Sequence, residues 1–275
     1  MKPADVLKRG CLEHDVAVAL CNCYDYLAKW FKRYDLDRGN RYDESYTHLE
    51  ELIWCFFMNQ RRDDFYVERG HKIAATYYLL SEDYQWYYKI DLIEYTVRVL
   101  RQGNKDSNRF NEIVDAFVTL VNEVLKKFNY AYRVVGEQVV ELTNENEVAA
   151  IEEVLTQPSA IRTHLSDALK HLSSRPIPDY RNSIKESISA VEVICRETTG
   201  KSTLGDALKE LEKKGVKIPT YIKSGIEKLY VYTNDKRTGI RHALMDDLEV
   251  PDYDEAKFML VACSAFINYL QGKRI

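Results

Sequence analysis

Apolar residues recur three and four positions apart along most of the chain, which is the spacing of one face of an α-helix. The segment 109–128 shows this spacing most completely. Its apolar positions are Phe110, Ile113, Val114, Phe117, Leu120, Val121, Val124 and Leu125. Segments 46–59 and 87–102 follow the same spacing, and no proline occurs between Pro3 and Pro158. The pattern predicts an all-α protein built from core-facing helices.

One stretch departs from the helical spacing. Residues 130–143, YAYRVVGEQVVELT, place aromatic and β-branched residues on both sides of Gly136. Such residues favour strands, and a central glycine favours a tight turn. The stretch predicts one short β-hairpin between Tyr132 and Leu142.

A helix start follows the expected hairpin. Thr143 and Asn144 stand directly before an apolar-periodic run, and both residue types cap helix N-termini. We therefore expect a domain boundary here, with an N-terminal helical domain over 1–142 that ends in the hairpin, and a second helical domain over 143–275.

The second half predicts a bundle of about four helices. Segment 178–200 spaces Ile184, Ile188, Val191 and Cys195 by four, three and four residues and then stops at a glycine. Segments 203–215 and 254–272 repeat the scheme. Segment 219–247 lies between them and reads as two helices divided by the turn-forming TNDKRTG.

Composition fits a soluble globular protein of the cytoplasm. The 275 residues are 45% hydrophobic and 30% charged, with no run of about 18 apolar residues and no signal-peptide core, so no membrane contact is expected. The net charge of -4 argues against indiscriminate binding to nucleic acid, so any RNA contact must be local. The six cysteines lack paired C-x-x-C spacing, and we expect them to be reduced, with no metal and no cofactor.

Segment 230–247 concentrates candidate chemistry, because Arg237, Arg241 and His242 fall within six residues. Such a cluster is compatible with a solvated, ion-paired helix face or with a phosphate-binding site. The remaining histidines lack such neighbours and are interpreted as surface or hydrogen-bonded residues. These are His14, His48, His71, His164 and His171.

The same residue types suit RNA cleavage without a metal. Attack of a ribose 2′-hydroxyl on the adjacent phosphate needs a proton acceptor, a proton donor and positive charge at the phosphate oxygens. Histidine can take either proton role near neutral pH. Arginine stays charged and matches phosphate oxygens with a fixed fork of donors.

These residues also carry a family resemblance. The helix order and the pair Arg237 and His242, separated by four residues, resemble HEPN domains, whose RNA-cleaving motif is Arg, four to six residues, then His. The segments DYRNSIKESISAVE, STLGDALKEL, GIRHAL, FFMNQRRDDF and WYYKIDLIEYT are similar to AbiJ-type abortive-infection proteins of bacteria, over most of the chain from about Tyr42 onward. Thr238 departs from the small polar Asn, His or Asp that often follows the HEPN arginine.

The resemblance implies a C-terminal HEPN-like four-helix bundle and a metal-independent endoribonuclease that acts as the toxic effector of an anti-phage system. It implies an RNA substrate, a homodimer through the C-terminal domain, and a partner defence protein or a phage trigger as regulator. Two alternatives remain: a catalytically inactive HEPN-like module for dimerisation or nucleotide binding, and a purely structural helical scaffold.

The motif arginine is either Arg237 or Arg241, with His242 as the proton-transfer residue. On one straight helix, residues five apart diverge by about 140°, so Arg237 and His242 converge only if the helix begins near Gly239. Arg241 lies about 100° from His242 on the same helix. Alternatively, a twofold axis brings the histidines of two chains together. Further expected substrate-binding residues are Asn234, Lys236, Thr238, Arg181 and Lys185, and the residues expected to orient His242 are Glu186 and Glu192.

Overall fold

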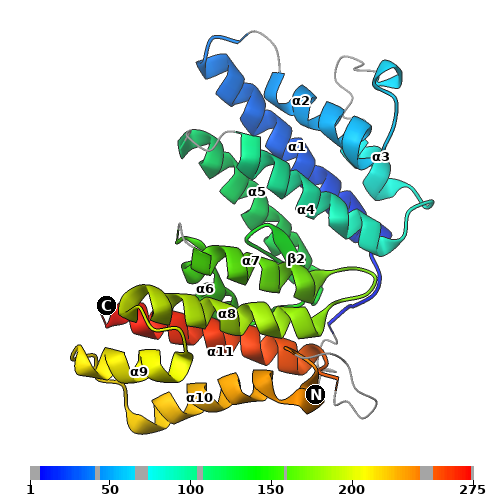
Figure 1. The fold of residues 1–275 in the computed structure, drawn as a ribbon. Coiled ribbons are helices and arrows are strands. Elements are labelled where there is room, and N and C mark those ends of the chain that lie inside the picture. Colours follow the sequence, from blue (N-terminus) through cyan, green and yellow to red (C-terminus); the bar gives the residue numbers. More distant parts are fainter. Residues whose placement is uncertain are drawn as a thin grey trace, which may run out of the picture. The chain divides into compact units, whose positions relative to one another are not determined.

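The computed structural model describes residues 7–40, 44–65, 74–103, 108–157, 160–241 and 250–273. The chain divides into two compact units, Met1–Glu141 and Leu142–Ile275 (Figure 1). In the described residues, eleven α-helices account for most of the structure, and one two-stranded hairpin is the only sheet. The prediction of an all-α fold with a single short hairpin is therefore confirmed.

The first unit is built around a long amphipathic helix. Helix α1 (His14–Asp37) packs against α2 (Glu44–Leu52), α3 (Ala74–Leu80) and α5 (Asn108–Lys127), while α4 (Trp86–Gly103) packs against α5. Large side chains fill the space between α1 and its neighbours, including an edge-to-face contact of Tyr24 with Phe117 at 5.2 Å between ring centroids. The aromatic residues of this unit thus act mainly as core.

The hairpin closes the first unit where the sequence predicts it. Strand β1 (Arg133–Val135) pairs in antiparallel fashion with β2 (Gln138–Val140), and Gly136 between them has a φ of 60°. The Asn122 amide on α5 binds both backbone groups of Val134, at 2.7 and 3.0 Å. These two bonds satisfy the N–H and the carbonyl of Val134 at an edge of the hairpin.

The predicted helix over 46–59 does not remain α-helical to its end. After α2 the chain continues as a π-helix (Ile53–Phe57), in which the Met58 N–H donates to the Ile53 carbonyl at 2.8 Å. A short 3₁₀ turn, η2 (Arg62–Asp64), follows. The spacing of apolar residues over so short a segment does not distinguish a π-helix from an α-helix. The change from α-helix to π-helix could therefore not be predicted from the sequence.

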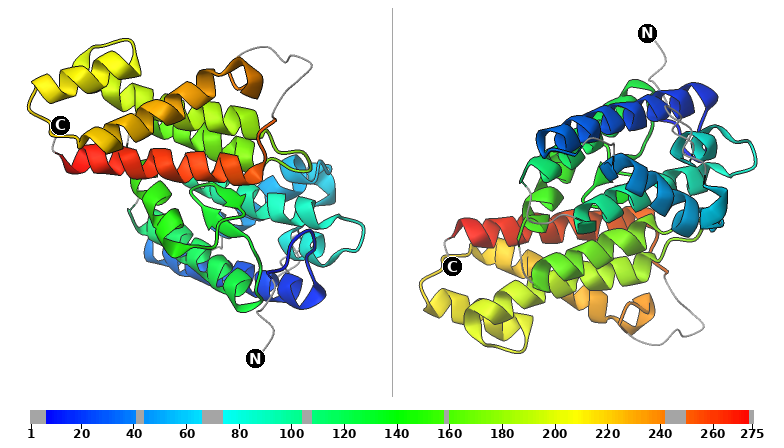
Figure 2. Two further views of the ribbon diagram at one scale, coloured as in Figure 1. Left: turned by 90° about the horizontal axis from the view of Figure 1, so that it is seen from below. Right: turned by 90° about the horizontal axis from the view of Figure 1, so that it is seen from above.

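The second unit is a bundle centred on α8 (Tyr180–Thr199) and α11 (Tyr253–Gly272), which pack side by side (Figures 1 and 2). Helix α7 (Ala160–Ser173) lies against α8, and α6 (Glu145–Leu155) lies against α7 and α11. Helices α9 (Leu204–Lys213) and α10 (Thr220–Asn234) pack on α8. The expected opening and closing helices of the bundle are α8 and α11.

Helix ends in this unit follow the caps that the sequence offers. The Asn144 side chain accepts from the Asn146 N–H at 2.9 Å and starts α6, as predicted. Asp179 caps α8, which ends at Gly200 with a φ of 72°. Asp252 and Glu255 form a reciprocal capping box at α11. These caps satisfy backbone donors that would otherwise lack partners.

One predicted helix of the bundle is not described. The TNDKRTG segment forms a 3₁₀ turn, η3 (Lys236–Thr238), after α10. The helix expected after this turn falls mainly on residues 242–249, which lie outside the described residues, and Ile240 and Arg241 are not helical. In the described part of the chain, no helix is both long enough and apolar enough to cross a membrane.

Candidate functional site

The turn after α10 is organised by Asp235. Its side chain accepts from the Arg237 N–H at 2.9 Å, and its carbonyl accepts from the Thr238 hydroxyl at 2.9 Å. Gly239 follows with a φ of 61°, a left-handed conformation that glycine adopts without steric cost. The turn reverses the chain and delivers Arg241 back toward α8.

Arg237 lies in this turn and is directed to the carboxylate of the same turn. Its Nη2 is 2.7 Å from Asp235 Oδ2, and its side chain is 73% exposed. Hydrogen bonds from the Arg237 side chain and backbone lower the pKa of Asp235 to about 2. Arg237 therefore stabilises the capped turn and keeps most of its surface in solvent.

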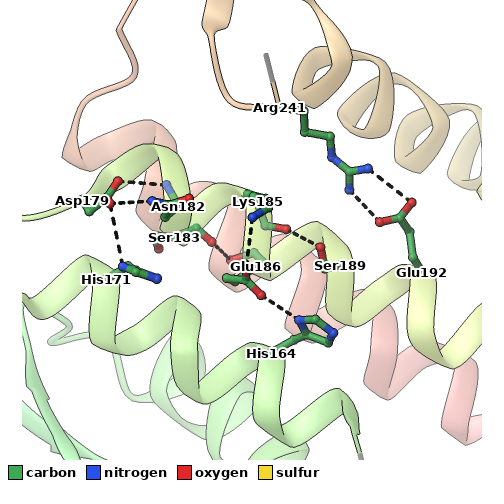
Figure 3. A network of polar contacts seen from close by, with 11 residues as sticks. His164, His171, Asp179, Asn182, Ser183, Lys185, Glu186, Ser189, Glu192 and Arg241 are labelled. Atoms are coloured by element: carbon green, nitrogen blue, oxygen red, sulfur yellow. Dashed lines mark hydrogen bonds and ion pairs between the residues drawn. The ribbon is translucent and has the colours of Figure 1, made fainter. Parts of the chain in front are cut away.

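Arg241 occupies a different environment, as Figure 3 shows. Its Nη2 is 2.6 Å from Glu192 Oε2 on α8, and its Nη1 is 3.4 Å from Oε1. Its guanidinium carbon is 5.3 Å from the centroid of the Tyr230 ring. The side chain is only 21% exposed, and Nε is buried without a hydrogen-bond partner among the described residues. Arg241 is thus held in a defined place by a carboxylate and an aromatic face.

Arg181 connects the turn to the start of α8. Its Nη2 donates to the Gly239 carbonyl. Arg181, Lys185 and Glu192 are spaced four and seven residues apart, so they share one face of α8. This face carries both the anchor of the turn and the partner of Arg241.

The other expected substrate-binding residues of the turn differ in exposure. Lys236 is exposed. The Asn234 amide donates to the Tyr230 carbonyl at 3.0 Å. Thr238 is 4% exposed, and its hydroxyl donates to the carbonyl of Asp235. Of these three side chains, that of Thr238 lies inside the turn.

The two expected orienting residues lie on α8 with different partners. Glu192 pairs with Arg241, whereas Glu186 pairs with His164 of α7, at 2.7 Å between Oε2 and Nδ1. His242, the residue that both were expected to orient, lies outside the described residues.

His164 reaches α8 from the α7 side and was not among the site residues predicted from the sequence. A signal for it exists in the α7 and α8 pair, because antiparallel helices joined by a short loop place mirrored positions opposite each other. His171 near the end of α7 faces Asp179 at the start of α8, at 3.9 Å. Seven residues further from the loop on each helix, His164 faces Glu186.

The chemistry of the face is therefore ionic and hydrogen-bonding. Lys185 Nζ lies 3.6 Å from Glu186 Oε1, so a lysine stands beside the His164 pair. Among the described residues, no three His, Cys, Asp or Glu side chains gather as potential metal ligands. The planar guanidinium of Arg241, which lies against α8, and Lys185 on the same face of α8 can both bind phosphate oxygens. For Arg241 the phosphate must compete with Glu192.

Comparison with protein families gives one match. The family model described as AbiJ N-terminal domain 4 matches residues 2–157, more than half of the chain. The matched range covers the first unit with its hairpin and continues through α6. No curated protein and no solved structure matches the chain.

Proposed function

Because the chain belongs to the AbiJ N-terminal domain 4 family, and so to the components of abortive-infection systems, we propose that it is a metal-independent endoribonuclease effector of bacterial anti-phage defence. The second unit would be a HEPN-like domain that carries the cleavage site. The first unit would sense infection or control access, with a phage product or a partner defence protein as trigger.

The observation that carries the proposal is the placement of Arg241. This residue directly precedes His242 in the chain, is held by Glu192 and Tyr230, and shares the α8 face with Lys185. We assign the phosphate contact to Arg241 rather than to Arg237, because Arg237 is largely exposed and paired within its own turn. Preorganised donors stabilise developing charge more effectively than mobile ones.

In the proposed reaction the ribose 2′-oxygen bonds to phosphorus and the 5′-oxygen leaves, which gives a 2′,3′-cyclic phosphate and a new 5′-hydroxyl. The 2′-hydroxyl proton passes to a base, and an acid protonates the leaving oxygen. His242 takes one of these roles. A homodimer through the second unit would bring a second His242 to the substrate, and so provide the other role.

The α8 partner of Arg241 also supports a second candidate function. Phosphate must compete with the Glu192 carboxylate, which already accepts two hydrogen bonds from Arg241. If Glu192 keeps the guanidinium, the domain would be a catalytically inactive HEPN-like module for dimerisation or nucleotide binding.

A cleavage assay with purified protein and total RNA in EDTA tests the proposal. We expect His242→Ala to reduce cleavage by about 10²- to 10⁴-fold and Arg241→Ala by about 10²- to 10³-fold. Arg237→Ala should be nearly neutral, and all variants must be fully folded at the assay temperature, as shown by their thermal unfolding curves. Intact RNA with the wild-type protein, or full activity of His242→Ala, would overturn the ribonuclease assignment.

The dimer and the trigger have separate tests. Light scattering should show a dimer at micromolar concentration. We expect its interface to bury about 1,200 Å² or more in total, as specific interfaces generally do. A fully active monomer would remove the dimer from the proposal. In cells, growth arrest that depends on infection and on His242 would support the effector role, whereas equal arrest by His242→Ala would contradict it.

A further inference from the structure

We propose that His164 and Lys185 form a second RNA subsite, which binds the sugar–phosphate backbone beside the Arg241 site. This inference rests on the proposed function, because it takes RNA as the ligand. It assigns binding rather than proton transfer to His164, a residue of α7.

The first support is the fixed orientation of His164. Glu186 Oε2 holds Nδ1 at 2.7 Å, so Nε2 is the ring nitrogen left for another partner. The side chain is 33% exposed, and that of Glu186 is 16% exposed. A carboxylate that fixes one ring nitrogen also fixes the direction of the other, as it does in many sites where histidine contacts a ligand.

The second support is the charge beside this pair. Lys185 Nζ is 3.6 Å from the other oxygen of Glu186, and Lys185 is 46% exposed. Lysine provides a strong positive charge for phosphate, and an imidazole nitrogen can bond a phosphate oxygen. Glu186 thus organises two groups of suitable chemistry for one nucleotide.

The third support is continuity with the Arg241 site. Glu186 and Glu192 are six residues apart on α8, which is about 9 Å along the helix axis and about 120° around it. Lys185 lies on the same helix face as Glu192 and Arg181, as their spacing of seven and four residues requires. Figure 3 labels Lys185, Glu186 and Glu192 along α8. This separation is too large for one phosphate to touch both His164 and Arg241, so the two positions suit successive parts of one strand that passes around α8 by way of Lys185.

A mirrored pair on the same helices provides a matched control. His171 is 34% exposed, close to the value for His164, and also faces a carboxylate across the α7 and α8 seam. Its partner Asp179 is 3.9 Å away, caps α8 and accepts from the Asn182 amide at 2.6 Å. His171 therefore lacks the short contact with its carboxylate that fixes the ring of His164.

Binding of a 2′-O-methyl RNA strand, which cannot be cleaved by 2′-hydroxyl attack, tests the subsite by fluorescence anisotropy. We expect His164→Ala and Lys185→Ala each to weaken binding about fivefold or more, and His171→Ala to leave it unchanged. Lys185→Ala should also lower the slope of log Kd against log salt by about 0.7, the value for one lost contact to a single strand.

A kinetic measurement separates binding from catalysis. With a long RNA substrate, His164→Ala should raise KM and preserve kcat, and with a dinucleotide it should change neither. His164→Gln, compared at matched melting temperature, guards against a loss of folding. Equal binding by His164→Ala and His171→Ala, or a loss of kcat alone, would overturn the subsite.

The two proposals fail differently. Wild-type protein that binds the methylated strand through His164 but leaves RNA intact would sink the ribonuclease assignment and retain the subsite. Wild-type protein that cleaves RNA while His164→Ala binds normally would sink only the subsite.

Discussion

Arg241 and Glu192, 49 residues apart in the sequence, form a two-point ion pair with a shortest distance of 2.6 Å between Nη2 and Oε2. The side chains are 21% and 23% exposed, respectively, and the guanidinium also lies over Tyr230. The pair therefore joins the chain after η3 to the middle of α8. It also determines how accessible the Arg241 guanidinium is to the proposed phosphate ligand.

Removing either partner of this pair should destabilise the second unit. We expect Arg241→Met and Glu192→Gln each to lower the free energy of unfolding by about 1–2 kcal/mol, because the remaining partner keeps a partly buried, unpaired group. A double-mutant cycle by urea denaturation should give a coupling energy of about 1 kcal/mol.

The corresponding cycle for Arg237 and Asp235 is the control. That arginine is 73% exposed, so solvent screens the pair and we expect a smaller coupling energy. A coupling for Arg241 and Glu192 no larger than that of the control would show that the α8 pair has little energetic role.

The pKa of Asp235 is a direct test of the turn geometry. Hydrogen bonds from Arg237 lower this pKa from 3.8 to about 2. A lowered folded-state pKa means that the stabilising contribution is complete above the unfolded value, near pH 4, and is lost as the pH falls through about 2. In a carboxyl NMR titration, Arg237→Ala should move the Asp235 midpoint back toward 3.8.

Lys236→Ala provides the comparison for that titration. Lys236 is exposed in the same turn and carries the same charge as Arg237. If Lys236→Ala raises the Asp235 pKa as much as Arg237→Ala does, the general positive charge of the turn, and not the hydrogen bonds, is responsible.

Features that depend on neighbouring residues could be predicted from the sequence. Ile184, Ile188, Val191 and Cys195 were assigned to one helix face, and all four are buried in α8. The hairpin around Gly136 and the Asn144 cap were likewise predictable, because turn and cap preferences act over a few residues.

Features that depend on packing between helices were not predictable. Glu186 was expected to orient His242, which lies outside the described residues. Among the described residues Glu186 pairs with Lys185 and with His164, which α7 brings to it. Nothing in the local sequence of α7 distinguishes His164 from His171. The difference comes from the carboxylate opposite each histidine, and hence from the register of α7 on α8.

A buried carboxylate should be essential for the stability of the first unit. Glu50 is 4% exposed and accepts from the Ala74 and Ala75 N–H groups at 2.7 and 3.3 Å, at the start of α3. It also accepts from the Tyr46 hydroxyl at 2.7 Å. Burial, followed by the charge of Glu50, raises the pKa of Tyr46 well above its ordinary value, so this hydroxyl remains a donor.

Glu50→Ala should therefore lower the free energy of unfolding by about 3 kcal/mol, because it leaves buried donors unpaired. The matched variant is Glu51→Ala, whose carboxylate is 24% exposed and pairs with Arg62 on the surface. That change should cost less than about 1 kcal/mol. Similar losses in the two variants, measured by denaturation, would contradict the buried role of Glu50.

Arg181 supports the turn that precedes Arg241. Its guanidinium donates to the Gly239 carbonyl and so ties the turn to the first residues of α8. Within the turn, the Arg237 and Thr238 N–H groups bond to Asp235, at 2.9 and 3.2 Å. Opening of the turn would expose these N–H groups to hydrogen exchange.

Arg181→Met keeps much of the apolar stem but removes the donors. We expect amide exchange at Arg237 and Thr238 to accelerate about tenfold, as the loss of one charge-assisted hydrogen bond of about 1.4 kcal/mol implies. Lys185→Met changes the same α8 face one turn later and should leave these amides unaffected, because Lys185 pairs with Glu186. Unchanged exchange in Arg181→Met would mean that Asp235 alone holds the turn, and that Arg241 is placed by Glu192 without help from Arg181.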